Sequence, residues 1–384
     1  MKKVVIISPR LENSFSGAEV YIVSLAKHLS KKYEVHIITR TNNGVYPDLG
    51  DVNIHYIEGI GSGNVNLLKA IPNLRKKLDE INPDIVHLHC FISLLLYSAI
   101  VESGKYKVIV TVHSTPDGTG KLFNWFDGNE TQRSFIKIMY EKVKCNVTLF
   151  GSDYYMNEYV KYVPTIKEIS DCYVNPYYSD MEEITIKERE KLDKHFEKDN
   201  IVRILFPSRI VKRKGIEETL QLLKLLPENY ILELPAMPQL EYQNYNEIAL
   251  NLIEELGLKN RVFYPNEKVI GNQMYEYYKR ADITIIPSYF EGFGIVAVEA
   301  MNASSPVVTT CTGGLGEIIK DDYNGVRISL DDLEDAKEKI IKLVEDKKYR
   351  YKIINNAKKT IEEKYSKTRH MALIDTIYKK LGDK

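Results

Sequence analysis

Short apolar segments without polar–apolar alternation recur along this chain, and stretches of helical composition separate them. Five of these segments lie in the first part of the chain, at Val4–Ile7, Val35–Ile38, Ile85–Leu88, Val108–Val112 and Val147–Phe150. A strand that is apolar on both faces must be covered on both faces, as in a parallel sheet flanked by helices. The first part of the chain is therefore predicted to be an α/β domain with a parallel sheet.

The same pattern begins again after residue 200, which indicates a second domain. Its segments are Val202–Phe206, Tyr230–Leu234, Val262–Tyr264, Ile283–Ile286 and Pro306–Thr310. With 384 residues, of which 44% are apolar, the chain can supply two hydrophobic cores. We therefore predict an α/β fold of two Rossmann-like domains.

The stretch between the two series, Asp180–Asn200, is dense in Glu, Lys and Asp, which favours a solvated helix or linker over a core element. The expected limits are 1–180 for the first domain, 181–200 for the charged linker, 201–365 for the second domain and 366–384 for a terminal helix. Open α/β sheets bind ligands at the carboxyl ends of their strands. We expect two such domains to face each other across a cleft that holds the ligand.

The overall composition narrows the classes of partner. Lys plus Arg equals Asp plus Glu at 53 each, so no overall field attracts nucleic acid. The cysteines show no CxxC spacing, and Met1 leads directly into a strand-like segment, which predicts a reducing cytoplasm. No stretch approaches the roughly 20 apolar residues that span a bilayer. The composition leaves the oligomeric state open.

The segment EGFGIVAVE, Glu291–Glu299, places two carboxylates around a Gly-Phe-Gly turn. A strand leads into the turn, and a helix is predicted from Ile295. The free N–H groups and the dipole of a helix start favour phosphate. Glu291 would lie beside the phosphates, and Glu299, more than a turn further on, could accept hydrogen bonds from ribose hydroxyls. This arrangement suits a nucleotide-sugar site; alternatively, the two carboxylates are an unrelated loop residue and helix-surface residue.

Several other segments match one family in order along the chain. They are Ser16–Glu19 (SGAE), Pro83–His89 (PDIVHLH), Val112–His113, Ser208–Gly215 (SRIVKRKG) and Tyr278–Asp282 (YKRAD), besides Glu291–Glu299. With these motifs the chain resembles the retaining glycosyltransferases of family four over nearly its whole length. The resemblance implies an acceptor-binding first domain, a nucleotide-sugar-binding second domain and a terminal helix that crosses back to the first domain.

Transfer from a nucleotide sugar releases a diphosphate on which negative charge grows. The loop after Val202–Phe206 is rich in Lys and Arg, and the resemblance singles out Arg209 and Lys214. A guanidinium and an ammonium in a water-poor site can stabilise the leaving diphosphate. We therefore expect no metal and no cofactor, with the nucleotide sugar as co-substrate. An exposed basic surface loop is the alternative.

In the first domain, the resemblance implicates Gly17 and His113. Gly17 would let the loop before its helix approach the diphosphate closely, because it has no side chain. His113, at the end of the Val108–Val112 strand, would donate a hydrogen bond to a sugar hydroxyl or support the developing cation. Packing is the alternative explanation for both residues.

By the same resemblance, Glu291 and the backbone N–H groups of Phe293 and Gly294 hold the donor sugar, while the N–H of Ile295 reaches the phosphate. The family retains the anomeric configuration, and the favoured mechanism is attack on the same face from which the diphosphate leaves. Whether Glu291 has a direct chemical role or only positions the donor stays open.

Some features have two interpretations. Leu67–Ile81 has one apolar face opposite a basic face, which fits a sheet-covering helix or a helix on a membrane surface. His87 and His89 share one face of a strand and could form part of a metal site, but a structural role is favoured. Leu11–Ser16 and Leu122–Phe126 are candidate acceptor contacts, and Tyr264–Ile270 lies where the resemblance expects the nucleobase.

We interpret the chain as a metal-independent, retaining hexosyltransferase that uses a nucleoside-diphosphate sugar, with UDP as the favoured carrier. The acceptor would be a hydroxyl of a glycan, a lipid-linked molecule or a small molecule, with peripheral membrane contact as an option. The alternatives are a non-catalytic partner subunit, or a sugar-nucleotide epimerase or glycan phosphorylase of the same architecture. A nicotinamide oxidoreductase is disfavoured because no GxGxxG follows the first strand.

Overall fold

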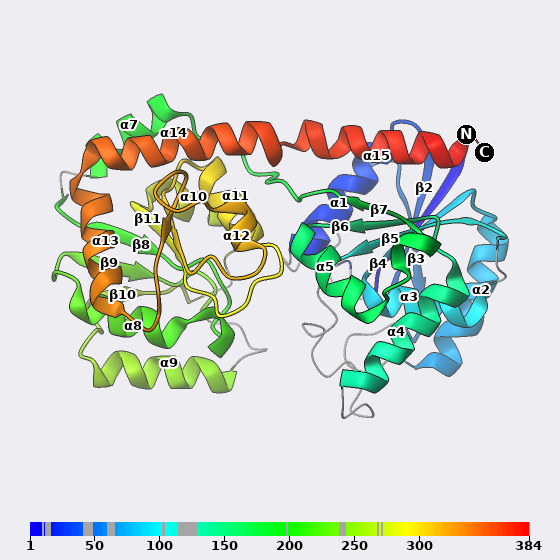
Figure 1. Ribbon diagram of the computed structural model, residues 1–384, viewed down its shortest axis with the longest axis horizontal. Coiled ribbons are helices and arrows are strands. Elements are labelled where there is room, and N and C mark those ends of the chain that lie inside the picture. The colour runs from blue at the N-terminus through cyan, green and yellow to red at the C-terminus, as the bar shows by residue number, and fades with distance from the viewer. Residues whose placement is uncertain are drawn as a thin grey trace. The chain divides into compact units, whose positions relative to one another are not determined.

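The structure of the protein is a computed structural model, which describes residues 1–9, 11, 17–40, 49–59, 66–101, 104–113, 129–196, 199–237, 243–266, 269 and 272–383. The chain forms two compact units. Unit 1 comprises Met1–Tyr177 and Thr368–Lys384, and unit 2 comprises Tyr178–Lys367. In each unit, helices pack against a parallel sheet (Figure 1).

The described part of unit 1 contains one sheet of seven parallel strands in the order β3-β2-β1-β4-β5-β6-β7. The strands are β1 Lys3–Ile7, β2 Glu34–Arg40, β3 Asn53–Ile57, β4 Ile85–His89, β5 Lys107–Val112, β6 Val147–Phe150 and β7 Asp171–Val174. The helices are α1 Gly17–Leu29, α2 Leu67–Ile81, α3 Cys90–Ile100, α4 Asn129–Val143, α5 Asp153–Tyr162, α6 Ile166–Ile169 and α15 Lys367–Gly382.

The strand order of unit 1 reverses between β1 and β4, which are direct neighbours in the sheet. Both strands are buried almost throughout because helices cover the two faces of the sheet. Such a reversal leaves a crevice outside the carboxyl ends of the two strands, where ligands of this fold class bind. The loops after β1 and β4 therefore occupy the position in unit 1 that is best suited to a site.

The terminal helix α15 packs on unit 1, beside the chain's N-terminal region (Figure 1). Its buried Tyr378 hydroxyl lies 2.7 Å from Nδ1 of His87 in β4. On its surface, Asp375 forms an ion pair with Lys32 at 2.8 Å. The last helix thus contributes to the core of the unit that contains the first strand.

The described part of unit 2 contains six parallel strands in the order β10-β9-β8-β11-β12-β13. They are β8 Val202–Leu205, β9 Tyr230–Glu233, β10 Val262–Phe263, β11 Ile283–Ile286, β12 Val307–Thr309 and β13 Val326–Arg327. The helices are α7 Ile186–Phe196, the 3₁₀ turn η3 Lys212–Lys214, α8 Ile216–Leu225, α9 Gln243–Glu255, α10 Asn272–Arg280, α11 Ile295–Asn302, α12 Leu315–Ile318, α13 Leu333–Glu345 and α14 Lys347–Lys364.

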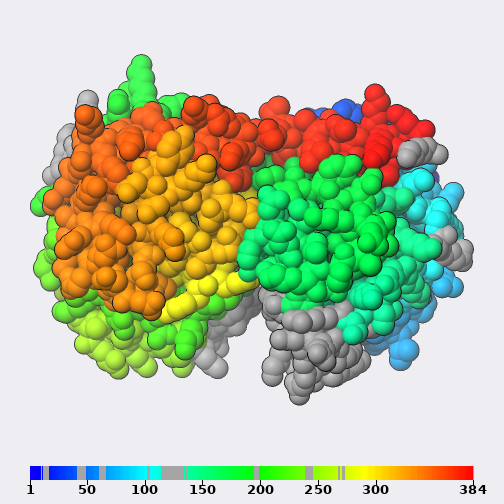
Figure 2. Space-filling view, viewed as in Figure 1, coloured from blue at the N-terminus to red at the C-terminus, as the bar shows by residue number. Residues whose placement is uncertain are grey.

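The order of strands in unit 2 reverses between β8 and β11, which pair directly through Ile204 and Ile283. The loops after these two strands are the ones that carry the predicted basic residues and the predicted carboxylate Glu291. In the space-filling view, α13 and α14, in orange, form part of the surface on one side of this unit (Figure 2). The two parallel α/β units confirm the predicted fold class.

The charged stretch 181–200 was predicted as a solvated helix or linker; it contains a helix, but two charged side chains of that helix are buried. Residues Ile186–Phe196 form α7, which belongs to unit 2. Its Arg189 is only 2% exposed and its Asp193 only 5%. Because an arginine can be buried when carbonyls and carboxylates surround it, charged composition alone did not distinguish a core-facing helix from a solvated one.

Helix α2 packs on unit 1 with most of its apolar face buried. Leu74, Leu78 and Ile81 are buried, whereas Leu68 is 89% exposed. Asn66 caps the start of the helix by accepting a hydrogen bond from the N–H of Lys69. The packing agrees with the sheet-covering interpretation for most of this face.

Candidate active site

The basic loop after β8 folds into the 3₁₀ turn η3 and ends at Gly215. This glycine has a φ of 73°, and a Cβ at its position would lie 2.1 Å from the carbonyl oxygen of Pro287. A glycine is therefore required, both by the backbone conformation and by the close approach of the neighbouring loop. The N–H of Tyr289 also donates to the carbonyl of Arg213 at 2.9 Å. The loops after β8 and β11 are consequently held together by backbone contacts.

The loop after β12 contacts the backbone of the Glu291 segment. The N–H of Gly314 donates to the carbonyl of Glu291 at 2.9 Å. A Cβ at Gly314 would meet the carbonyl oxygen of Gly292 at 2.2 Å, so only glycine allows this approach. These contacts position the backbone of Glu291 without using its carboxylate.

The Nζ of Lys214 forms an ion pair with the carboxylate of Glu291. Both side chains are largely buried, with exposed fractions of 8% for Lys214 and 17% for Glu291. Burial lowers the pKa of Lys214, against the opposing effect of the Glu291 charge. Arg209, in contrast, is exposed on the same loop. The structure thus brings together two residues, Lys214 and Glu291, that the sequence predicted on separate loops.

Helix α11 begins directly after the Gly-Phe-Gly turn. Gly294 has a φ of 97°, and a Cβ there would lie 2.4 Å from Cδ2 of Leu315. Phe293 is 4% exposed and contacts the ring of Tyr365 edge-on, with 6.1 Å between centroids. Ile295 is the first residue of the helix, so its N–H is one of those that lack a partner within the helix. The Phe293 ring therefore anchors the turn, and the start of α11 offers N–H groups to an anion.

Glu299 lies within α11 and accepts a hydrogen bond from the hydroxyl of Tyr278 at 2.9 Å. Tyr278, in α10, is fully buried. Burial raises the pKa of the Glu299 carboxyl to about 7, while the Tyr278 hydrogen bond acts in the opposite direction. A carboxylate kept inside the protein with one oxygen already bonded can present its other oxygen to a ligand hydroxyl.

Two further hydroxyls lie on the same loops, although the sequence motifs assign no role to either. Ser208 and Ser288 are 4% and 0% exposed, and their Oγ atoms have no hydrogen-bond partner in the part of the chain that the structure describes. Buried hydroxyls are usually bonded, so these two stand out beside Arg209 and Glu291. Only the burial of the loops identifies them, because serine is common in exposed loops.

In unit 1, His113 lies at the end of β5 in a cluster of rings. Its Nε2 is 2.9 Å from Nδ1 of His89, and its Nδ1 is 2.9 Å from the hydroxyl of Tyr177. The Tyr177 hydroxyl donates its proton to the carbonyl of Val112 at 3.0 Å, since a carbonyl can only accept. The Tyr177 oxygen must then accept from His113 Nδ1–H. These directions assign the neutral tautomer of His113.

The same reasoning assigns His89. With its proton on Nδ1, neutral His113 accepts at Nε2, so His89 donates from its own Nδ1. Burial lowers the pKa of His113 to about 4 and the pKa of His89 well below its usual value, so both rings are neutral near pH 7. In this arrangement His113 has no ring N–H to spare for a sugar hydroxyl. The predicted donation therefore requires the hydrogen bond from His113 Nδ1–H to Tyr177 to open.

His87 belongs to the interior of unit 1. Its ring nitrogens lie 2.7 Å from the Tyr378 hydroxyl and 2.7 Å from Oγ1 of Thr111. Among the described residues, no group of three or more His, Cys, Asp and Glu side chains is arranged to hold a metal ion. The contacts of His87 agree with its favoured structural interpretation.

Gly17 is the first residue of α1 and is exposed at the N-terminus of that helix. The predicted acceptor segment Leu122–Phe126 lies outside the described residues, as does Leu11–Ser16 except for the buried Leu11. In the predicted nucleobase segment, Tyr264 is 44% exposed, and residues 267, 268 and 270 lie outside the described residues. No described helix has the length and apolar composition needed to cross a membrane.

The fold and the placement of these motifs point to one class of enzyme, which comparison with known proteins identifies. The family model for Glycosyl transferases group 1 matches residues 187–360, and the model for Glycosyltransferase Family 4 matches residues 15–166. The chain belongs to this family of glycosyltransferases, which confirms the resemblance inferred from its motifs.

One relative and two solved structures are similar to this chain over most or all of its length, and the solved structures show the likeness of the fold. The chain is 27% identical to an uncharacterised glycosyltransferase of Methanocaldococcus jannaschii, with 91% of this chain and 90% of that protein covered. The fold is similar to sucrose-phosphate synthase from Thermosynechococcus elongatus, with a TM-score of 0.81 at 16% identity and full coverage of both chains. It is also similar to Anabaena HepE in complex with UDP-glucose, with a TM-score of 0.78 at 16% identity, covering 99% of this chain and 100% of that chain.

Proposed function

We propose that the protein is a retaining, metal-independent hexosyltransferase that takes its sugar from a nucleoside diphosphate, with UDP as the favoured carrier. The acceptor is a hydroxyl of a glycan, a lipid-linked molecule or a small molecule. The observation that carries this proposal is the Lys214–Glu291 pair at the carboxyl ends of β8 and β11, beside the start of α11.

The charges around this pair suit a diphosphate that carries a sugar. Arg209 and Lys214 supply the positive charge, and the first N–H groups of α11, at the positive end of the helix dipole, favour an anion. In a site that excludes water, a preorganised donor of this kind contributes about 3 kcal/mol to transition-state stabilisation. That magnitude is compatible with departure of the diphosphate without a metal ion.

Each carboxylate then has a separate task. Glu291, with the N–H groups of Phe293 and Gly294, holds the donor sugar, and Ile295 N–H reaches the phosphate. Glu299 accepts from the ribose, with its position set by the Tyr278 hydroxyl. The acceptor hydroxyl attacks the face from which the diphosphate leaves, and the departing phosphate oxygen takes its proton. This course retains the anomeric configuration and requires no covalent intermediate on the enzyme.

UDP is favoured as the carrier because HepE, which shares the fold, is described in complex with UDP-glucose. Exposed Tyr264 lies at the end of β10, where the resemblance expects the base, and its ring offers a stacking surface. In unit 1, Gly17 and His113 are assigned to the approach to the diphosphate and to the donor sugar.

A thermal-unfolding screen in EDTA tests the donor. The protein is mixed with UDP-, GDP-, ADP- and dTDP-sugars, and a ligand at ~100 times its dissociation constant adds about 2.7 kcal/mol to stability. We expect one carrier to raise the melting temperature and Arg209→Ala to abolish the rise. Lys212→Ala, on the same loop and also exposed, is the matched control and should keep it.

Each outcome distinguishes the alternatives. If no carrier stabilises the protein, the donor site is not functional and the non-catalytic partner subunit becomes the better hypothesis. If a carrier is bound and then converted without any acceptor to an epimer, the transferase assignment is wrong. Release of free nucleotide that depends on an acceptor supports it and excludes both the epimerase and the phosphorylase.

A further inference from the structure

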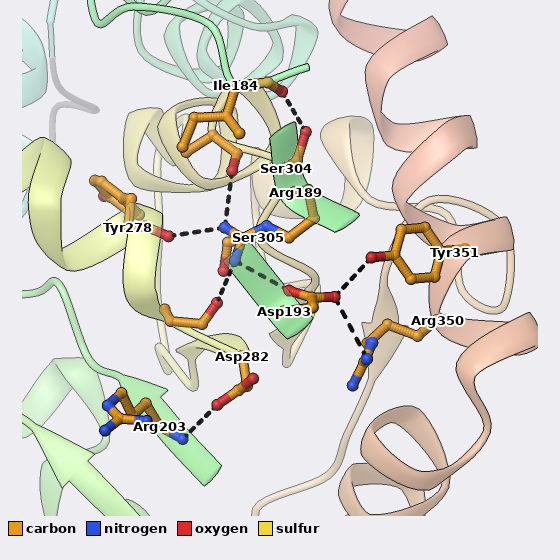
Figure 3. A network of polar contacts seen from close by, with 12 residues as sticks. Ile184, Arg189, Asp193, Arg203, Tyr278, Asp282, Ser304, Ser305, Arg350 and Tyr351 are labelled. Carbon is orange, nitrogen blue, oxygen red and sulfur yellow. Dashed lines mark hydrogen bonds and ion pairs between the residues drawn. The ribbon is translucent and has the colours of Figure 1, made fainter. Parts of the chain in front are cut away.

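Arg189 of α7 is a buried arginine that bonds to the ends of two other helices. Its guanidinium donates to the carbonyls of Tyr278 at 3.2 Å, Ala281 at 3.3 Å and Ala303 at 3.1 Å (Figure 3). The side chain is 2% exposed, so these bonds form in the protein interior. One residue thus serves three backbone acceptors that come from two separate segments.

Those acceptors lie at the carboxyl ends of α10 and α11. The last carbonyls of a helix have no partner within it, and the helix dipole makes that end negative. A buried cation at this place satisfies the carbonyls and the dipole together. Arg189 therefore caps both helices at once and sets the position of each relative to the other.

The same two helices carry the pair that is assigned to the ribose. Tyr278 offers its carbonyl to Arg189 and its hydroxyl to Glu299, so the residue is held at both ends. Ala303 follows Glu299 by one helical turn, and its N–H donates to the carbonyl of Glu299 at 2.9 Å. A displacement of either helix end would change the distance between the Tyr278 hydroxyl and the Glu299 carboxylate.

The guanidinium is itself held in place by a network of polar side chains. Asp193, one turn along α7, forms an ion pair with it at 3.5 Å. Asp193 also accepts from the Tyr351 hydroxyl at 2.7 Å and from Arg350 at 3.4 Å, which ties α7 to α14 (Figure 3). The Nε of Arg189 has no partner within the described structure, so this burial carries a cost that simple packing would avoid.

We propose that Arg189 is a positioning residue for donor binding, which sets the geometry of the Tyr278–Glu299 pair that accepts the ribose hydroxyls. This inference rests on the proposed function, because it takes Glu299 to contact the ribose. Arg189 acts through the two helix ends and does not itself touch the donor.

The test compares Arg189→Met with Arg261→Met in the full-length protein. Arg261 is the matched control, since it is another buried arginine that donates to three backbone carbonyls, but these belong to Leu226, Pro227 and Tyr230, outside α10 and α11. Affinities for UDP and 2′-deoxy-UDP are measured by calorimetry for each variant. If the screen selects another base, the corresponding ribo and deoxy pair is used.

The wild type should bind UDP about tenfold more tightly than 2′-deoxy-UDP, the expected size of one hydrogen bond to a charged group. Arg189→Met should weaken UDP binding by about tenfold and reduce this preference to less than about threefold, as Glu299→Gln should. Arg261→Met should lower the melting temperature and leave the preference unchanged. Arg189→Lys, which keeps the charge with one nitrogen, should give an intermediate preference.

An equal preference in Arg189→Met and Arg261→Met would overturn the inference and leave Arg189 a structural residue. The same holds if the wild type binds both nucleotides equally well. If Arg189→Met does not unfold cooperatively, Arg189→Lys is used for the test instead. A preference for UDP over 2′-deoxy-UDP that equals that of the wild type would then contradict the inference. Failure of the proposed function gives a different result, since the wild type then binds neither nucleotide.

Discussion

The sheets of the two units reverse their strand order in the same way, but the side chains at their carboxyl ends differ in charge. In unit 2, the loops after β8 and β11 bring the ammonium of Lys214 to the carboxylate of Glu291. In unit 1, the ends of β4 and β5 bring His89 to His113 as two neutral rings. Both pairs are shielded from water, yet one is ionic and the other uncharged.

The difference shows what decides the state of a titratable group inside a protein. Burial disfavours the charged form of every such group, and an opposite charge nearby offsets that cost. Lys214 has Glu291, whereas the neighbours of His113 are another imidazole and a tyrosine hydroxyl. The histidines of unit 1 therefore stay neutral, while unit 2 keeps a cation, which the proposed function assigns to the diphosphate.

The largest expected effect comes from removing the carboxylate of the ionic pair. Glu291→Gln should keep nucleotide binding but lower kcat by about 100-fold or more, the cost of losing a preorganised group at the reacting centre. Because no acceptor is identified, kcat is measured for the slow hydrolysis of the donor, in which water takes the place of the acceptor. Glu276→Gln, an exposed carboxylate on α10, is the control and should react normally. Near-normal turnover in Glu291→Gln would rule out the assigned role.

Removing the Lys214 cation should instead weaken UDP binding more than it slows the transfer of the sugar. Lys214→Met should weaken UDP binding by about 30-fold, through loss of a charge-assisted contact worth about 2 kcal/mol. It should also lower the melting temperature, because Glu291 is left buried without its partner. The double variant Lys214→Met/Glu291→Gln should regain stability but not affinity. A double variant as unstable as Lys214→Met would contradict the ion-pair account.

The hydrogen bonds that link the neutral side chains of His89, His113 and Tyr177 in unit 1 can be interrupted at Tyr177. Tyr177→Phe leaves the buried N–H of His113 without an acceptor and should cost about 1.5 kcal/mol of the free energy of unfolding. Nitrogen chemical shifts of His113 should then report a change of tautomer. Tyr155→Phe removes a hydroxyl that donates to the His113 carbonyl at 3.0 Å, so it is the control and should preserve the tautomer. An unchanged His113 tautomer in Tyr177→Phe would refute the assigned hydrogen-bond directions.

The smallest effect concerns the carboxylate that is buried without a cation. The pKa of Glu299 is raised from 4.5 to about 7 by burial, so the folded state loses relative stability as the pH rises through that interval. Glu299→Gln keeps an acceptor for Tyr278 without the charge. Its melting temperature relative to the wild type should rise between about pH 4.5 and pH 7 and stay constant above. At pH 8 we expect a gain of about 2 °C, measured by calorimetry; no gain would indicate that Glu299 ionises without cost.

The strands show where prediction from the sequence succeeds. The apolar runs at β1, β4, β5 and β6 lie in the middle of the sheet and are covered on both faces. The edge strands β3 and β7 were missed because half-exposed edges need no continuous apolar run. Asn53–Ile57 alternates polar and apolar residues, and Asp171–Val174 begins with an exposed aspartate. The two-residue strand β13 is too short to leave a pattern.

Prediction of the site succeeded for individual loops and failed for contacts between them. The spacing of Glu291, Gly294 and Glu299 indicated a turn followed by a helix, and the structure has this arrangement. The role of Arg189 left no signal in the sequence, because a charged residue in a Lys- and Glu-rich helix resembles a solvated one. Its environment consists of carbonyls from helices that are distant along the chain.

The sequence by itself determined the class of fold, the family and the loops that carry the candidate residues, since local apolar periodicity and short motifs encode these features. Only the tertiary structure decided that β8 lies next to β11 and β4 next to β5, and so which side chains meet. Those neighbours set the charge of each group. The same physical cost of burial therefore yields an ion pair at Lys214 and a neutral ring at His113, depending on what the fold brings beside it.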